Sequence, residues 1–312
     1  MKTTLVLKVD GDLAAWRAGF EQCAPQFDVR AWDDDTLDPR QVEYVLVWRP
    51  HAGWHARFPN LRLILSAAAG VDHLLADPTL PSHVPIVRMV TPETGERMGD
   101  YVLFAALGLV RELPALVAAR EAGAWASSLT GRLASETTVG VMGIGQLGAA
   151  CAHRLVAAGF PVVGWSRTSK VINGVRCLHG AEGLAEFLTR SDILVNLLPQ
   201  TEATRRILNA ETMSLLPYGA ALINVGRSSH VDHEALVALL DGGHLRAAVL
   251  DVFDSEPLPQ GHRMWGHPKV FITPHVASTA SVSTRAERAA DSIRAHQAGV
   301  VLAHLYDRDH GY

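Results

Sequence analysis

The chain has 312 residues, of which 48% are hydrophobic and 19% charged, and its formal net charge is −4. This length and composition predict a packed protein of two domains. The negative charge argues against a nucleic-acid partner, because phosphate backbones are bound by basic surfaces. The apolar runs are shorter than the about 20 residues of a membrane-spanning helix, and the run near the N-terminus is too short for a signal peptide. We therefore expect a cytoplasmic protein without a nucleic-acid or membrane partner.

The cysteine pattern gives no sign of a disulfide framework or a metal site. Cys23, Cys151 and Cys177 are scattered along the chain without C-x-x-C spacing. Reduced thiols are therefore expected, as in cytosolic proteins, and no bound metal is predicted. Cys151 follows a glycine-rich turn on an expected helix, where a buried structural role is favoured over a reactive one.

The first third of the chain alternates short apolar runs with helical or loop stretches, a pattern typical of buried parallel strands. The elements expected here are the strands Thr4–Val9, Tyr44–Trp48, Leu61–Ser66 and Ile86–Val90 and the helix Leu13–Gln22. The pattern stops near Pro92, where Gly95 and Gly99 also interrupt the chain. A long apolar helix from about Met98 to Ala122 is expected to follow and to cross between two domains.

A polar loop, residues 127–136, leads into a second region of alternating strands and helices. The elements expected there are strand Thr138–Met142, helix 146–158, strand Pro161–Trp165, helix Ala181–Leu188, strand Ile193–Leu197, helix Ala210–Leu215, strand Ala220–Asn224, helix Asp232–Leu240 and strands Leu245–Asp251 and Val270–Ile272. Sustained β-α-β alternation predicts a doubly wound parallel sheet. The last helix, roughly 281–299, is expected to return to the first domain. We therefore predict two α/β domains, one formed by 1–97 with 279–312 and the other by 98–278.

A glycine-rich turn joins the strand at 138–142 to the helix that follows, and it reads Gly143-Ile144-Gly145-Gln146-Leu147-Gly148. In this strand-turn-helix context, Gly143 permits a tight turn and Gly145 lets the backbone approach a pyrophosphate. Gly148 lets helix and strand pack closely, and the helix N-terminus attracts phosphate. The motif predicts a dinucleotide site that includes Gln146 and Leu147.

The end of the next strand indicates which dinucleotide is bound. NAD-binding proteins place an acidic residue there to bond the ribose 2′-hydroxyl, but this chain reads Trp165-Ser166-Arg167-Thr168-Ser169-Lys170. Arg167 and Lys170 would attract a 2′-phosphate, and the hydroxyls of Ser166 and Thr168 would bond it. NADPH is therefore favoured over NADH, and an exposed basic loop without a ligand is the alternative.

Three further residues form a candidate catalytic set. Arg227 follows the strand at 220–224 and can hold a carboxylate by two parallel hydrogen bonds. Glu256 and His275 lie in the segments Asp251-Val252-Phe253-Asp254-Ser255-Glu256-Pro257 and Thr273-Pro274-His275-Val276-Ala277. A carboxylate beside an imidazole stabilises the protonated ring, which can then give a proton to a developing alkoxide near neutral pH. Together with a nicotinamide cofactor, this set predicts a dehydrogenase.

The order of these motifs, G-x-G-x-x-G, N-x-x-R, D-V-F-x-x-E-P and P-H-x-A, resembles the D-2-hydroxy-acid dehydrogenase family over nearly the whole chain. The resemblance implies that Arg227 binds the substrate, Glu256 tunes the histidine and His275 donates a proton to the carbonyl. It also implies a Rossmann dinucleotide-binding domain at 98–278 and a smaller, flavodoxin-like substrate domain at 1–97 and 279–312.

Within this family the chain most resembles the branch of glyoxylate/hydroxypyruvate reductases. The segments that carry this likeness are Val47-Trp48, Ala69-Gly70-Val71-Asp72, Trp165-Ser166-Arg167-Thr168, Asn196-Leu197-Leu198-Pro199 and Asp307-Arg308 with Gly311-Tyr312. The likeness implies reduction of glyoxylate to glycolate and of hydroxypyruvate to glycerate, with NADPH preferred and NADH as the alternative. The helix and loop at about 98–136 would then pack on a second copy, forming a homodimer.

The same likeness assigns further residues to the two ligands. The residues expected near the 2-oxo acid, in addition to Arg227 and His275, are Trp48, Arg49, Ala69, Gly70 and Val71. Those expected near the cofactor, in addition to the glycine turn and the basic loop, are Leu198, Pro199, Thr204, Val225, Gly226 and Asp251. The backbone amides around Gly70 would bind the substrate carboxylate.

Two departures from the family pattern leave alternatives open. Ser228 stands where the family commonly has glycine after the arginine, and Ser169 stands where relatives carry a second basic residue. The first bears on the backbone of the Arg227 loop, and the second on how strictly NADPH is preferred.

Two alternative functions stay open. The chain could be a dehydrogenase for a different 2-oxo acid, or a nucleotide-sensing regulatory protein on the same scaffold.

Overall fold

The computed structural model describes residues 2–311. Met1 and Tyr312, the ends of the expected first domain, lie outside the described residues, as does the last position of the C-terminal segment that carries the resemblance. The chain divides into two compact units, Met1–Glu93 with Thr279–Tyr312 and Thr94–Ser278. Helix α3 (Pro92–Val110) runs from the first unit into the second.

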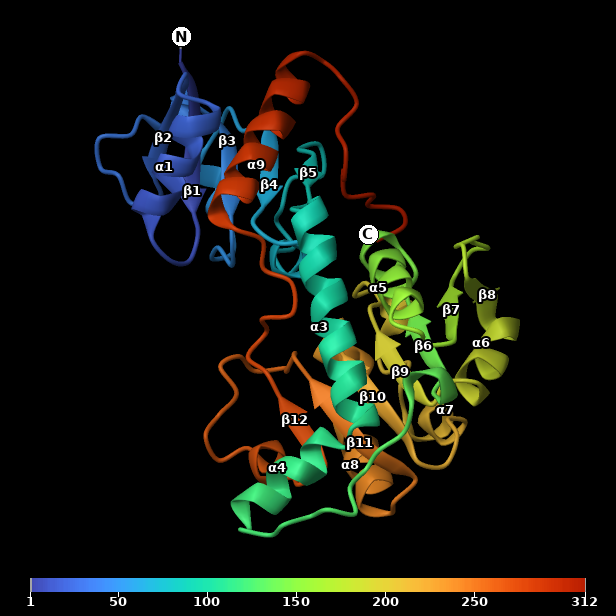
Figure 1. The fold of residues 1–312 in the computed structure, drawn as a ribbon. Helices are drawn as coiled ribbons and strands as arrows, with labels where there is room; N and C mark the ends of the chain where they lie inside the picture. The colour runs from blue at the N-terminus through green and yellow to red at the C-terminus, as the bar shows by residue number, and fades with distance from the viewer. Residues whose placement is uncertain (1, 312) are drawn as a thin grey trace. The chain divides into compact units, whose positions relative to one another are not determined.

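The smaller unit contains a five-stranded parallel sheet of order β2-β1-β3-β4-β5 (Figure 1). Its elements are β1 (Thr3–Lys8), α1 (Leu13–Cys23), β2 (Phe27–Ala31), β3 (Val42–Val47), β4 (Leu63–Ser66), the short α2 (Asp72–Leu75), β5 (Ile86–Val87) and α9 (Val282–Gln297). This strand order is the flavodoxin-like one, so the predicted doubly wound sheet is confirmed. Strand β2 was not predicted, because it is an edge strand whose side chains are mostly half-buried.

Helix α9 supplies part of the core of this smaller unit, as expected for the last helix. It lies beside α1 in Figure 1, and Ala286 and Ile293 pack in one cluster with Trp16 and Phe20 of α1. A Cβ built on Gly19 would lie 3.1 Å from the Cβ of Ala286, so the two helices approach closely. The first unit is therefore discontinuous in sequence.

The larger unit contains a seven-stranded parallel sheet of order β12-β11-β10-β9-β6-β7-β8. Its elements after α3 are α4 (Leu113–Glu121), β6 (Val139–Met142), α5 (Gln146–Ala157), β7 (Val162–Ser166), β8 (Val175–His179), α6 (Gly180–Thr189), β9 (Ile193–Asn196), α7 (Ala210–Ser214), β10 (Ala220–Asn224), α8 (His233–Asp241), β11 (Leu245–Leu250) and β12 (Val270–Ile272). The strand order reverses direction between β6 and β9, as in Rossmann sheets. Strand β8 was not predicted, because it is another partly exposed edge strand.

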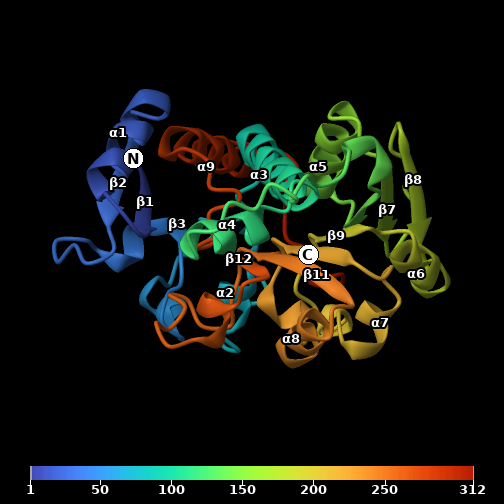
Figure 2. The same ribbon diagram turned by 60° about the horizontal axis from the view of Figure 1, so that its bottom comes forward.

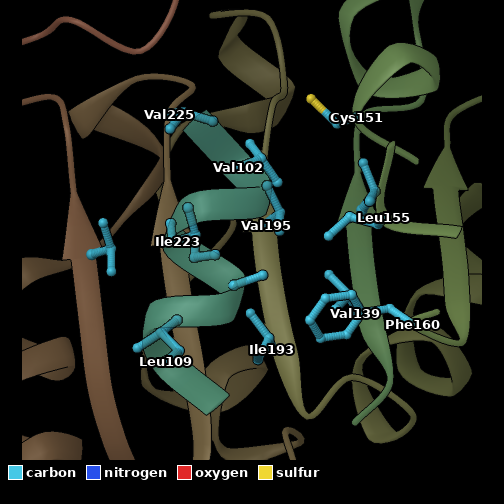
Figure 3. Packing of buried hydrophobic residues seen from close by; sticks show 14 of the residues in the cluster. Val102, Leu109, Val139, Cys151, Leu155, Phe160, Ile193, Val195, Ile223 and Val225 are labelled. Carbon is cyan, nitrogen blue, oxygen red and sulfur yellow. The ribbon is translucent and has the colours of Figure 1, made fainter. Parts of the chain in front are cut away.

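Helices cover both faces of this larger sheet (Figure 2). On one face, Val102 and Leu109 of α3 and Leu155 of α5 pack on Val195 and Ile223 of the central strands (Figure 3). On the other face, residues from α6, α7 and α8 pack on the alternate side chains of the same strands. Because successive side chains of a strand point to opposite faces, strands buried on both sides have the continuous apolar sequence that identified them.

The expected single helix at about 98–122 is wrong in both its start and its continuity. Helix α3 already begins at Pro92, and the chain bends by 66° between α3 and α4. Glu112 takes a left-handed conformation at the break, and Pro114 lies in the first turn of α4. A proline inside a continuing helix would lose a hydrogen bond and clash with the preceding turn, so a new helix begins there.

Gly95, which was expected to precede the helix, therefore lies inside α3, as Gly99 does. Cβ atoms built on them would lie 3.5 Å from the Cβ atoms of Ala150 and Arg154, so these glycines allow α3 to pack closely on α5. Among residues 2–311 no single helix has the length and hydropathy needed to cross a membrane, although α3 and α4 taken together across their bend do.

Candidate active site

In the larger unit, the loops predicted to carry function follow the carboxyl ends of the parallel strands. Strands β6, β9 and β10 are parallel and in register, with Met142 opposite Asn196 and Asn196 opposite Asn224. Asn224 in turn lies opposite Leu250 of β11. The carboxyl ends of these strands therefore coincide, and ligands of doubly wound sheets bind in the crevice outside them.

The glycine turn has the steric properties that a dinucleotide site requires. Gly143 has a φ of +99°, and a Cβ there would lie 2.8 Å from the carbonyl carbon of Leu197. A Cβ on Gly148 would lie 2.0 Å from the carbonyl oxygen of Gly143, so only glycine lets helix α5 begin this close to β6. In contrast, a Cβ on Gly145 would meet no atom of residues 2–311 within 4 Å.

The open side of the turn is where a pyrophosphate would fit. Gly145 precedes α5, whose first helical residues are Gln146 and Leu147. The amides at a helix N-terminus have no partners within the helix and favour anionic groups. The turn therefore fits the phosphates of a dinucleotide.

The loop after β7 is basic and exposed. Ser166 is buried, and its hydroxyl donates a 2.8 Å hydrogen bond to the carbonyl oxygen of Thr168. Arg167, Thr168 and Lys170 are exposed. The two cations can thus meet an anion from solvent, whereas the Ser166 hydroxyl already bonds within the loop and supports its shape.

The residues expected beside the nicotinamide lie in the loop after β9. The Leu198 amide donates to the side-chain oxygen of Asn196 at 3.2 Å, and the Leu198 side chain is buried. The hydroxyl of Thr204 donates to the carbonyl oxygen of Pro199 at 2.8 Å. These bonds hold the loop, and contacts of Leu198, Pro199 and Thr204 with a cofactor stay predictions.

The carboxylate of Asp251 organises the segment that carries His275. It accepts hydrogen bonds from the hydroxyl of Thr273 at 2.6 Å and from the amides of Val276 at 2.9 Å and Ala277 at 3.0 Å. The amide of His275 donates to the Asp251 carbonyl oxygen at 2.9 Å. These bonds commit both carboxylate oxygens of this buried aspartate to the loop, so the structure gives Asp251 a positioning role. Its contact with a cofactor stays a prediction.

A tyrosine that the sequence did not single out extends this arrangement. The hydroxyl of Tyr101 on α3 is hydrogen-bonded to Thr273, and Thr273 donates to Asp251. Because Thr273 gives its one hydroxyl proton to Asp251, the Tyr101 hydroxyl is the donor to Thr273, and burial raises the pKa of Tyr101, which keeps that hydroxyl protonated. Tyrosine in an apolar helix gives no signal of this role in the sequence, because its partner is 172 residues away.

Glu256 and His275 form the predicted pair. Nδ1 of His275 lies 2.8 Å from Oε2 of Glu256, while Oε1 of Glu256 accepts a 3.0 Å hydrogen bond from the Phe253 amide. The histidine side chain is 39% exposed, and the glutamate side chain 19% exposed. The pairing fixes the ring through Nδ1 and leaves Nε2 as the nitrogen that can give a proton to a ligand.

His275 adopts an uncommon backbone conformation. Its φ is 56°, in the left-handed region. Such a conformation costs free energy for a residue with a side chain, and it persists only where surrounding contacts enforce it. Here the contacts are the bonds of the Asp251 carboxylate to the two residues that follow His275.

Arg227 follows Val225 and Gly226 at the end of β10. Its guanidinium Nη1 donates a 2.8 Å hydrogen bond to the carbonyl oxygen of Gly226. Ser228, where the family commonly has glycine, begins a short 3₁₀ helix, Ser228–His230, a right-handed conformation that accepts a side chain. Its hydroxyl lies 3.3 Å from Nε2 of His233. The departure at Ser228 is therefore accommodated.

The expected substrate residues of the smaller unit lie at the carboxyl ends of two neighbouring strands. Trp48 and Arg49 follow β3, and the Arg49 guanidinium lies 4.9 Å from the Trp48 ring centroid. The loop after β4 contains Gly70, whose carbonyl oxygen accepts a 3.0 Å bond from the hydroxyl of Ser66. Trp48, Arg49 and the loop formed by Ala69, Gly70 and Val71 stay predictions as substrate ligands.

Comparisons with known proteins agree with this geometry. Residues 103–277 match the family model "D-isomer specific 2-hydroxyacid dehydrogenase, NAD binding domain". The chain is 38% identical over 302 residues to a glyoxylate/hydroxypyruvate reductase A of Serratia proteamaculans (strain 568), covering 95% of this chain and 96% of that protein.

Two solved structures are similar over the full length of both chains. A D-isomer specific 2-hydroxyacid dehydrogenase from Xanthobacter autotrophicus Py2, in complex with NADPH and MES, gives a TM-score of 0.94 at 42% identity. An NADPH-dependent glyoxylate/hydroxypyruvate reductase from Sinorhizobium meliloti, in complex with NADP and sulfate, gives 0.93 at 35% identity. The sequence-based resemblance is confirmed: the chain belongs to the D-isomer specific 2-hydroxyacid dehydrogenase family.

Proposed function

We propose that this protein reduces small 2-oxo acids with NADPH, converting glyoxylate to glycolate and hydroxypyruvate to glycerate. The observation that carries the proposal is the 2.8 Å His275–Glu256 pair in a loop at the carboxyl end of a Rossmann-type sheet. The names of the relatives and the NADPH and NADP found in similar structures support the choice of substrate and cofactor. A different 2-oxo acid is the alternative within the same chemistry.

The larger unit would hold the cofactor. Gly143, Gly145 and Gly148 shape the turn for the pyrophosphate, and Arg167 and Lys170 would attract the 2′-phosphate. Leu198, Pro199, Thr204, Val225 and Gly226 would border the nicotinamide half. When bound, the cofactor supplies hydride to the carbonyl carbon of the substrate.

Arg227 would bind the substrate carboxylate. A guanidinium can form two parallel hydrogen bonds to a carboxylate, which orients the acid as well as binding it. Its positive charge would also stabilise the negative charge that develops on the carbonyl oxygen. We therefore expect its removal to weaken substrate binding and to slow the reaction together.

His275 would donate the proton that completes the reduction. Glu256 holds the ring through Nδ1, and Nε2, when it carries a proton, would transfer that proton to the carbonyl oxygen of the substrate. Because Glu256 is itself fixed by the Phe253 amide, the ring is oriented before substrate binds. The same pair would work in reverse, with His275 accepting the proton of a 2-hydroxy acid.

The protein would act in the cytoplasm as a homodimer. Several exposed apolar side chains lie on α3, on α4 and on the loop that follows them, namely Phe104, Leu107, Leu116, Trp125 and Leu133. Exposed apolar side chains are stabilised by burial against another protein. Light scattering at micromolar concentration, on the intact chain and on a Phe104→Glu variant, would test the dimer. A monomeric intact chain would contradict it.

The decisive experiment is the initial rate of nicotinamide oxidation with glyoxylate and with hydroxypyruvate, measured with NADPH and NADH side by side. Turnover that favours NADPH is the expected result. Turnover with NADH alone would contradict the proposed role of Arg167 but not the proposed roles of Arg227, Glu256 and His275. Nucleotide binding without turnover of either acid would indicate another oxo acid or a sensing role.

A further inference from the structure

Three buried polar side chains lie beneath the loop that carries Arg227. Asn196, Asn224 and His230 are each 0% exposed. Asn196 and Asn224 end neighbouring strands and stand opposite each other in register. Buried polar groups are costly unless they are hydrogen-bonded, so such a cluster is kept only with defined partners.

Backbone donors determine which way both amides point. The Leu198 amide donates to Oδ1 of Asn196 at 3.2 Å, so Nδ2 of Asn196 faces the other two members of the cluster. The Gly226 amide likewise donates to Oδ1 of Asn224 at 3.2 Å, and Nδ2 of Asn224 donates to the Arg227 carbonyl oxygen at 3.1 Å. An amide flip would set a donor against a donor at either residue.

These orientations also determine the tautomer of His230. Its Nδ1 lies 2.9 Å from Nδ2 of Asn196 and 3.3 Å from the backbone nitrogen of Arg227. Both neighbours carry hydrogen and can only donate. Nδ1 must therefore accept, and the ring proton resides on Nε2.

The loop fits tightly over this cluster. A Cβ built on Gly226 would lie 3.0 Å from Nδ2 of Asn196 and 3.2 Å from Nδ1 of His230. The backbone of Arg227 is thus held at both ends of the residue, since its nitrogen donates to His230 and its carbonyl oxygen accepts from Asn224. The buried polar cluster therefore fixes the position of the Arg227 Cα atom, to which the side chain is attached.

We propose that His230, as its Nε2-protonated neutral tautomer, is a positioning residue for Arg227 and acts by accepting hydrogen bonds at Nδ1. This inference rests on the proposed function, in which Arg227 binds the substrate carboxylate. Through Asn196 the same cluster reaches the Leu198 amide, so the loop expected beside the nicotinamide and the loop expected beside the substrate share one set of buried bonds.

A matched pair of variants tests the acceptor. His230→Asn can place its amide oxygen where Nδ1 lies, whereas His230→Leu has nearly the same size and shape as asparagine but no acceptor. Leucine would leave the Nδ2 group of Asn196 and the backbone amide of Arg227 without the acceptor that they share. We therefore expect kcat/KM for the oxo acid to fall by about 10- to 100-fold. The asparagine variant should stay within about threefold of the wild type, and the dissociation constant for NADPH should change little in either.

Ser191→Ala provides the control for a general loss of stability. Ser191 is buried in the same unit, and its hydroxyl donates a 2.8 Å hydrogen bond to Phe187 near the amino end of β9. This variant should lower the melting temperature while leaving KM and kcat unchanged.

A double variant tests whether His230 acts through Arg227. Combining His230→Leu with Arg227→Lys should lower kcat/KM little more than Arg227→Lys alone, because the effects of residues that act through one another are not additive.

Equal kinetic constants for His230→Leu and the wild type would overturn the positioning role. Equal losses of kcat/KM in the leucine and asparagine variants would also overturn it.

The tautomer of His230 can be tested without turnover. Two-bond ¹⁵N–¹H correlation spectra of imidazole-labelled protein report it, and the signal that is missing in His230→Asn identifies the ring. A proton on Nδ1 would overturn the proposal. If the wild type reduces no oxo acid, the proposed function fails, and the tautomer together with hydrogen exchange at the Arg227 amide still decides the positioning.

Discussion

Two loops that follow the carboxyl ends of strands in the larger sheet are supported in different ways. The loop that carries His275 rests on the buried carboxylate of Asp251, which accepts three hydrogen bonds from it. The loop after β7 presents Arg167 and Lys170 to solvent and is shaped by a hydrogen bond from Ser166 within the loop itself. The first loop is therefore fixed from the interior of the protein, whereas the second lies at the surface.

This difference matches what each loop is proposed to do. Proton transfer depends on the distance and direction between donor and acceptor, so the residue that performs it needs a rigid support. Attraction of a phosphate depends chiefly on charge, and exposed cations can adjust to it. Substitutions in the first region should therefore change kcat, and substitutions in the second should change the affinity for the cofactor.

The largest effect should come from His275→Ala. Loss of a general acid costs about 10²- to 10⁴-fold in rate, and kcat at neutral pH should fall within that range while the KM for NADPH changes little. His153→Ala, an exposed histidine on α5, is the matched control and should behave as the wild type. A His275→Ala variant with most of its kcat would exclude the proton-donor role.

Asp251→Asn should have the next largest effect, although we place no direct chemistry on this side chain. The new amide would set a donor against the Ala277 amide and loosen the segment around His275. Leaving a buried donor unpaired costs about 1–3 kcal/mol, so we expect kcat to fall by about 10- to 100-fold together with the melting temperature. Unchanged kcat in a destabilised variant would show that the buried support is not needed for catalysis.

Arg167→Ala probes the exposed loop, and a smaller effect is expected. Loss of one charge-assisted hydrogen bond at an exposed position should raise the KM for NADPH by about tenfold and leave kcat and the KM for NADH nearly unchanged. Arg176→Ala on the edge strand β8 removes the same charge from an arginine that pairs with Glu186, and should alter neither KM. Equal effects of the two variants would show that the Arg167 position is not special.

The smallest effect concerns pH and a histidine beside the Arg227 loop. Burial lowers the pKa of His233 below its usual 6.5. The unfolded chain therefore binds more protons at this residue below pH 6.5, so stability from the neutral ring is complete above that pH and is lost as the pH falls. Urea unfolding at pH 7.5 and 5.5 should show a smaller loss in His233→Gln than in the wild type. An identical loss in both would refute this assignment.

Much of the fold follows from local chemistry along the chain. Strands buried on both faces, such as β9 and β10, form continuous apolar runs that can be recognised without neighbours. The edge strands β2 and β8 were missed because their half-buried or exposed side chains interrupt that pattern. The helix expected at 98–122 was misjudged because the apolar composition continues through the bend at Glu112.

The sequence by itself determined the fold class, the family and the glycine turn, and it singled out Arg227, Glu256 and His275 as candidate residues, because residue type and short spacing carry that information. Tertiary structure alone decided how these residues are held. Tyr101 lies 172 residues from Thr273, and Asn196 lies 34 residues from His230, so no local pattern links them. Asn196 and His230 meet because the parallel strands β9 and β10 end side by side, where buried polar groups must find partners away from water. Tyr101 reaches Thr273 because helix α3 packs on the same sheet.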